Sequence, residues 1–122
     1  MTTSKDLILL VDDDTTILST SQMMLEALGY EVEAAESGEK AVEIATGNCD
    51  RFKLILTDLS MPDMDGQVLL TKMRELGFKG PIAIVSGYAL NVDDLDGDFV
   101  GVLMKPFRLN TLKEKVAEFL GN

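Results

Sequence analysis

Four apolar runs of this sequence are each followed directly by polar side chains that could act together in one reaction. Three carboxylates, Asp12, Asp13 and Asp58, are joined by the hydroxyl of Ser86 and the ammonium group of Lys105. Carboxylates held close together repel one another, which raises their pKa values and costs stability unless a cation intervenes. Ligation by oxygen alone suits a hard divalent ion, and Mg²⁺ leaves coordination positions for water and phosphate oxygens. These residue types therefore predict a magnesium site that can receive a phosphate group.

A carboxylate nucleophile, a divalent ion, a lysine and a hydroxyl together form an apparatus for phosphoryl transfer. The ion and Lys105 would neutralise the phosphoryl oxygens while a carboxylate attacks in line, giving an aspartyl phosphate. Each residue also has an ordinary structural interpretation when it is taken alone. An aspartate run after a strand often caps a helix, Asp63 and Asp65 are typical turn or cap residues, and Ser86 and Lys105 stand in turn sequences. Their coincidence at successive strand ends favours the functional interpretation.

The apolar runs before these groups have the pattern of buried parallel strands. They are short and almost continuously apolar, and stretches of helical spacing separate them. We expect strands at residues 7–11, 30–34, 54–57, 82–85 and 100–104. This alternation predicts an α/β fold, with a doubly wound five-stranded parallel sheet and helices on both faces. Ligands bind such sheets at the carboxyl ends of the strands, so the polar groups should converge there.

Capping residues mark where the expected helices begin and end. The candidate N-caps are Asp14 to Thr16, Ser37 and Asp65, and the candidate stops are Gly29, Gly47, Gly77 and Gly121. The stretch from residue 89 to residue 98 is different, because its four aspartates, one asparagine and one glycine weaken a helix. We expect a short or irregular element in place of a fourth helix there.

Length, charge and composition narrow the class of protein. The 122 residues are expected to form a single domain, residues 1–122. A formal net charge of −10 disfavours nucleic-acid binding, and the lack of histidine assigns any phosphohistidine step to a partner. Cys49 is the only cysteine, and the apolar run at residues 7–11 is too short for a signal peptide or a membrane span. We therefore expect a cytoplasmic protein that does not bind membranes.

Together these residues resemble the receiver domain of two-component response regulators. The markers are Asp12-Asp13, Asp58 followed by Met61-Pro62-Asp63-Met64-Asp65-Gly66, then Ser86, and Lys105-Pro106-Phe107. Each marker is weak alone, but in this order and spacing they are highly specific, and the resemblance covers nearly the whole chain. It implies a flavodoxin-like sheet with the strand order 2-1-3-4-5.

The resemblance also implies the roles of the acidic residues. Asp58 would accept a phosphoryl group from a phosphohistidine on a sensor histidine kinase or a phosphotransfer protein. Asp13 and Asp58 would ligate Mg²⁺ directly, helped by the backbone carbonyl of Ser60, and Asp12 would act largely through water. Such a domain is a signalling protein rather than an enzyme, since it catalyses only its own phosphorylation and dephosphorylation.

The same resemblance implies how the phosphorylated state would be recognised. Ser86 and Lys105 would contact the phosphoryl oxygens, and the Lys105–Pro106 peptide would be cis. Phosphorylation would draw Ser86 inward and remodel the face that, in the family's fold, is formed by the fourth helix, the fifth strand and the fifth helix. The sequence departs from the family at Val102, where a Tyr or Phe is usual, and in the short stretch between Ser86 and Lys105. We therefore expect signalling through another surface, or a role as a phosphate relay or sink.

Two other classes of protein remain open from the residues. Asp12-Asp13-Asp14-Thr15-Thr16 resembles the D-x-D-x-T motif of haloacid-dehalogenase-like phosphatases, in which Asp12 would be the nucleophile and Asp14 the acid/base. That interpretation leaves Asp58 to Gly66 and Lys105-Pro106-Phe107 without a role. The third class is an interaction module that is never phosphorylated, which the acidic residues disfavour.

The sequence leaves the setting of the domain open. It fits a free-standing regulator, and it fits equally the receiver of a hybrid histidine kinase, which the stretches Ser86-Gly87-Tyr88-Ala89 and Lys105-Pro106-Phe107 resemble. The downstream protein partner is unknown. Either a monomer or a weak dimer is compatible with the sequence.

Overall fold

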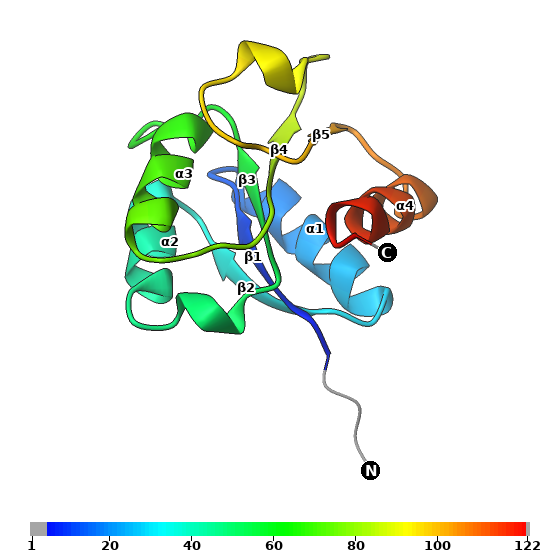
Figure 1. Ribbon diagram of the computed structural model, residues 1–122. Helices are drawn as coiled ribbons and strands as arrows, with labels where there is room; N and C mark the ends of the chain where they lie inside the picture. The colour runs from blue at the N-terminus through cyan, green and yellow to red at the C-terminus, as the bar shows by residue number, and fades with distance from the viewer. Residues whose placement is uncertain (1–4, 122) are drawn as a thin grey trace.

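The chain folds into three layers, with a parallel sheet between two pairs of helices (Figure 1). The computed structural model describes residues 5–121, so both ends of the expected domain lie outside the described part. The elements in chain order are β1 (Leu7–Val11), α1 (Thr15–Ala27), β2 (Glu31–Ala35), α2 (Gly38–Ala45), η1 (Cys49–Arg51), β3 (Leu54–Asp58), α3 (Gly66–Glu75), β4 (Ile82–Ser86), η2 (Val92–Asp94), β5 (Val102–Met104) and α4 (Leu109–Phe119). Within the described residues, no helix has the length and apolar character needed to cross a membrane.

The sheet has the strand order 2-1-3-4-5, and every pair of neighbouring strands is parallel. This confirms the predicted fold class and the strand order that the resemblance implied. Most strand bounds agree with the sequence to within a residue, and β3 and β4 each include the polar residue that follows the apolar run, Asp58 and Ser86. Strand β5 is shorter than expected, because it begins at Val102 rather than at Val100.

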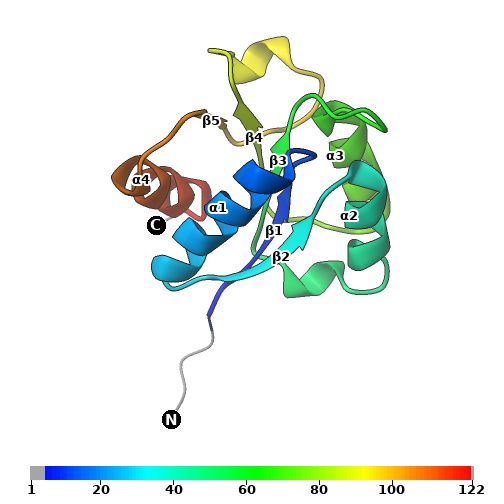
Figure 2. The ribbon, with the colours of Figure 1, turned by 180° about the vertical axis from the view of Figure 1, so that it is seen from behind.

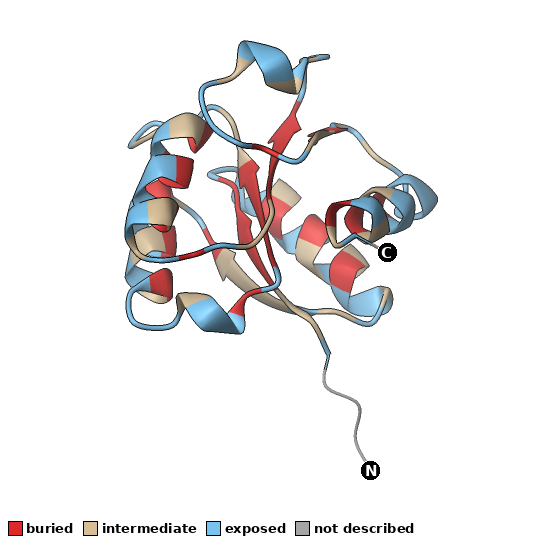
Figure 3. Cartoon of the chain, viewed as in Figure 1, coloured by how far each residue is buried: buried red, intermediate tan, exposed pale blue. Residues whose placement is uncertain are grey.

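Two hydrophobic cores hold the sheet between its helices. Helices α2 and α3 cover one face, and α1 and α4 cover the other (Figures 1 and 2). Successive residues of a strand point to opposite faces, so Leu9 of β1 packs toward α2 and α3 while Ile8 packs toward α1 and α4. Figure 3 shows β1, β3 and β4 buried along nearly their whole length. This double cover explains why these strands are continuously apolar rather than alternating.

The chain between β4 and β5 contains only one short 3-10 turn, η2, which confirms the expectation of a short or irregular element. Side chains of α3 hold this segment in place. Arg74 pairs with Asp98, with 3.1 Å between Nη2 and Oδ2, and the side-chain oxygen of Gln67 accepts a hydrogen bond of 2.6 Å from the amide of Asp96. The segment is therefore fixed by these polar contacts and by its apolar side chains that pack against the core, rather than by the hydrogen bonds of an α-helix.

Asp63 caps a helix that is remote from it in sequence. Its Oδ2 accepts a hydrogen bond of 2.7 Å from the amide of Glu39, and its Oδ1 accepts one of 3.3 Å from the amide of Gly38. Ser37 caps the same end of α2, since its Oγ accepts from the amide of Lys40 at 3.0 Å. Three amides that have no partner inside the helix thus find acceptors. These bonds, that from Glu39 above all, lower the pKa of Asp63 below its usual value of 3.8.

We expect Asp63→Ala to lower the free energy of unfolding by about 1 kcal/mol at neutral pH, the typical effect of losing an N-cap. The pKa of Asp63 is lower in the folded chain than in the unfolded chain, where it is near 3.8. The stabilisation by the charged carboxylate is therefore complete at a pH above the unfolded pKa, and it is lost as the pH falls through the folded pKa. Urea denaturation of both proteins, from neutral pH to the lowest pH at which they stay folded, measures the difference. A difference that grows toward low pH would contradict this explanation.

Candidate functional site

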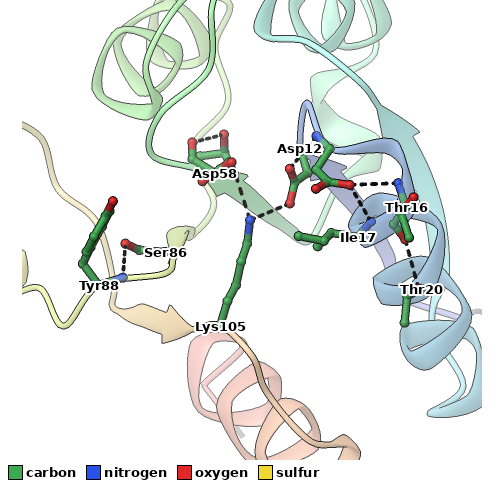
Figure 4. A network of polar contacts seen from close by, with 10 residues as sticks. Asp12, Thr16, Ile17, Thr20, Asp58, Ser86, Tyr88 and Lys105 are labelled. Atoms are coloured by element: carbon green, nitrogen blue, oxygen red, sulfur yellow. Dashed lines mark hydrogen bonds and ion pairs between the residues drawn. The ribbon is translucent and has the colours of Figure 1, made fainter.

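The carboxylates that follow β1 and β3 meet at one edge of the sheet (Figure 4). The pairing of β1 with β3 sets Val11 beside Thr57, so the next residues, Asp12 and Asp58, emerge side by side. Asp13 follows Asp12 in the β1–α1 loop. Each of these aspartates offers one carboxylate oxygen, and the three oxygens all lie within 4.8 Å of one another. The structure thus brings together the three acidic residues that the sequence singled out.

Lys105, which directly follows β5, reaches two of these carboxylates (Figure 4). Its Nζ is 2.8 Å from Oδ2 of Asp12 and 3.5 Å from Oδ2 of Asp58. Its backbone amide donates to the carbonyl of Ser86 at 2.7 Å, and the Lys105–Pro106 peptide is cis, as the resemblance implied. The side chain of Lys105 is only 16% exposed, so the ion pairs are partly shielded from water.

The electrostatics of the cluster favour added positive charge. Burial raises the pKa of Asp58, Lys105 offsets part of this rise, and the neighbouring charges of Asp12 and Asp13 add to it. Burial by itself lowers the pKa of Lys105, but the hydrogen bond that its ammonium group donates to Asp12 and the charges of Asp12 and Asp58 outweigh this effect, so the net pKa is raised. Only one lysine faces the three carboxylates, so a second cation would stabilise the cluster further.

Asp12 and Asp14 also make bonds that define their structural roles. Asp12 is buried, and its Oδ1 accepts a hydrogen bond of 2.9 Å from the amide of Asp14. Asp14 is the N-cap of α1, since its Oδ1 accepts from the amides of Thr16 and Ile17 at 3.0 and 3.1 Å. The carboxylate that the phosphatase interpretation needs as acid/base is thus engaged at a helix terminus.

The two serines of the predicted site lie on different elements. Ser86 ends β4, the strand next to β3, and its buried Oγ accepts a hydrogen bond of 3.0 Å from the amide of Tyr88. Ser60 is an exposed residue of the loop between β3 and α3, two positions after Asp58. Ser86 thus lies at the end of the strand next to β3, which carries Asp58. The backbone of Ser60 lies in the loop that follows Asp58.

Two further residues, Thr57 and Gly66, fix the backbone of Asp58, a role that the sequence did not assign to them. Thr57 is fully buried, and its hydroxyl donates to the carbonyl of Asp58 at 3.0 Å. Gly66, the first residue of α3, lies so close that a Cβ added there would be 2.9 Å from the carbonyl oxygen of Asp58 and 2.8 Å from Cδ1 of Ile84. The sequence marked Gly66 only as the residue after Asp65, the candidate N-cap. The packing around Gly66 shows that a side chain would not fit there.

Comparison with known proteins identifies the family. Residues 8–117 match the family model of the response regulator receiver domain, so the chain belongs to the receiver-domain family. A curated relative, the cell cycle response regulator CtrA of Brucella ovis, is 31% identical over 112 residues, which cover 89% of this chain and 47% of CtrA. The chain thus spans about half the length of the curated relatives that it matches.

Solved structures agree with this assignment. The chemotaxis protein CheY4 of Vibrio cholerae superimposes with a TM-score of 0.86 at 28% identity, covering 95% of this chain and 99% of CheY4. The receiver domain of the hybrid histidine kinase CckA has a TM-score of 0.81 at 36% identity, with 93% and 98% coverage. The response regulator TrrA of Thermotoga maritima, in complex with Mg²⁺ and BeF, has a TM-score of 0.80 at 29% identity, with 93% and 98% coverage.

The family defines the general function. Receiver domains have the phosphoacceptor role in two-component signalling, and the haloacid-dehalogenase-like alternative is not favoured. The prediction of a receiver domain from the sequence is therefore confirmed. The roles of individual residues are not decided by family membership and are argued below from the geometry of the site.

Proposed function

We propose that this domain accepts a phosphoryl group on Asp58 from a phosphohistidine of a partner protein. The observation that carries the proposal is the position of the Asp58 carboxylate, within 4.8 Å of oxygens of Asp12 and Asp13 and 3.5 Å from the ammonium group of Lys105. One oxygen of Asp58 forms a P–O bond while the P–N bond of the phosphohistidine breaks, and the imidazole leaves with the electron pair. The rigid strand end holds the nucleophile for in-line attack.

The donor set fits a resident Mg²⁺. Three carboxylate oxygens lie close enough to share one ion, and they are hard ligands of the kind that Mg²⁺ prefers. We assign direct ligation to Asp13, Asp58 and the backbone carbonyl of Ser60, with Asp12 acting largely through water. The bound ion would neutralise negative charge on the transferred group. TrrA, a relative whose structure contains Mg²⁺ and BeF, supports this assignment.

Lys105 and Ser86 would stabilise the phosphoryl group once it is bound. The Nζ of Lys105 already lies 3.5 Å from Asp58, so a phosphoryl oxygen on Asp58 would come within its reach. Ser86 ends the strand beside β3, and its hydroxyl would donate to another phosphoryl oxygen when phosphorylation draws it inward. The domain thereby catalyses its own phosphorylation and dephosphorylation and has no external substrate to turn over.

The partner is a sensor histidine kinase or a phosphotransfer protein, because this sequence contains no histidine of its own. The similarity to the CckA receiver, a domain of a hybrid histidine kinase, is compatible with this donor. The chain could serve alone or within a larger protein, as a monomer or a weak dimer, and the acidic net charge of −10 disfavours nucleic acid as a ligand. Because its one cysteine, Cys49, cannot form a disulfide within the sequence, we assign the domain to the reducing cytoplasm.

The route of the signal beyond Asp58 differs from the usual one. Val102 packs against the core on the α2 and α3 side, where receivers usually carry the ring of a Tyr or Phe. Phe99 is buried and Tyr88 is exposed, and neither stands at the sequence position of that ring, three residues before Lys105. We expect the domain to signal through another surface, or to relay or store phosphate. Amide chemical shifts with and without Mg²⁺ and beryllofluoride test this, and a swing of Tyr88 or Phe99 with a rebuilt segment at residues 87–101 would contradict it.

Incubation with MgCl₂ and acetyl phosphate tests the acceptor directly. We expect the intact protein to gain the mass of one phosphoryl group, and we expect Asp58→Asn to gain none, because the amide is not a nucleophile. Chelation of Mg²⁺ should also abolish labelling. A label that survives Asp58→Asn but vanishes with Asp12→Asn would favour the phosphatase instead. No label on any variant would favour an interaction module.

A further inference from the structure

We propose that Asp63 is a positioning residue of the cation site, which acts by tying the loop that carries Ser60 to helix α2. The inference rests on the proposed function, since Ser60 is assigned there as a backbone ligand. Asp63 lies too far along the loop to be counted among the three clustered carboxylates. Its carboxylate instead bonds the amides of Gly38 and Glu39, which are 25 and 24 residues away in sequence.

A second contact joins the same two segments. Met64 lies directly on Gly38, so close that a Cβ added to Gly38 would be 2.2 Å from Cγ and 2.7 Å from Sδ of Met64. With any larger residue at position 38, the side chain of Met64 would have to move away from the helix. Asp63 and Met64 therefore attach consecutive residues of the loop to the first turn of α2, one by hydrogen bonds and the other by packing.

The chain between Ser60 and Asp63 has little freedom to absorb a movement. Met61 is 9% exposed and belongs to the core, and the ring of Pro62 fixes its φ angle. On the other side of Ser60, the carbonyl of Leu59 accepts a hydrogen bond of 2.8 Å from the amide of Gly66. The backbone of Ser60 is thus held between the end of β3 and the anchor at Asp63.

Helix α2 is in turn fixed to the other ligand-bearing loop. The carbonyl of Ala35, the last residue of β2, accepts a hydrogen bond of 3.1 Å from the amide of Asp12. Three residues later, Gly38 opens α2 and binds Asp63. The loop after β1 and the loop after β3 are therefore connected through the short segment from Ala35 to Glu39. Loss of the Asp63 bonds would release the Ser60 carbonyl relative to the carboxylates.

Titration of the ¹⁵N-labelled chain with MgCl₂, followed by amide chemical shifts, tests this connection. We expect Asp63→Ala to raise the Kd for Mg²⁺ on the order of 10-fold, the lower range for loss of a group that orients a metal ligand. Asp63→Asn keeps one acceptor oxygen for the α2 amides and should retain most of the affinity. Ser37→Ala is the matched control, because it removes a cap from the same helix end without touching the loop, and its Kd should equal that of the wild type.

Each other result counts against the inference. Equal losses in Asp63→Ala and Asp63→Asn would show that only the negative charge matters. An equal loss in Ser37→Ala would show that any weakening of α2 has the same effect. A wild-type Kd in Asp63→Ala would overturn the inference alone and leave the proposed function intact. A wild-type chain that binds no Mg²⁺ would overturn the proposed function and this inference with it.

Discussion

Repulsion among three carboxylates at one edge of the sheet is the interaction on which the rest of the site depends. Side chains that repel one another stay together only where the backbone that carries them is held firmly and a positive charge lies near. The described part of the chain supplies that charge through Lys105, which bonds Asp12 and approaches Asp58. Burial above all raises the pKa of Asp58. Because one lysine faces three carboxylates, negative charge remains in excess. The cluster is thereby prepared for a divalent ion and a phosphoryl group.

The fold provides the firm backbone from both sides. Strands β1 and β3 are buried between two helical layers, so their ends move little relative to each other. Beyond the strand ends, individual hydrogen bonds hold the loops. The amide of Asp12 donates to the last residue of β2, and the carboxylate of Asp63 accepts from the first amides of α2. The segment at residues 87–101 lacks a helix of its own and is held by contacts such as that of Arg74 with Asp98. The same molecule thus combines a firmly held carboxylate cluster with a segment between β4 and β5 that lacks an α-helix.

The sequence predicted the fold and the site because both depend on local patterns. Short apolar runs indicate strands buried on both faces, and the residues that follow these runs must lie at the same edge of a parallel sheet. Asp58, Ser86 and Lys105 could be found in this way without coordinates. The partner of Asp63 could not, because nothing in its local sequence shows that its carboxylate bonds a helix 24 residues earlier. The turn η1 was missed as well, since three residues carry no periodicity.

A crystal structure of this chain with Mg²⁺ and beryllofluoride would locate both the ion and the phosphoryl mimic, and would thus decide whether Asp58 is the acceptor. We expect beryllium bonded to the carboxylate of Asp58, Mg²⁺ at about 2.1 Å from oxygens of Asp13 and Asp58, and the Nζ of Lys105 turned from the carboxylates to a fluorine. Beryllium on Asp12, or an ion bound away from the three aspartates, would contradict it.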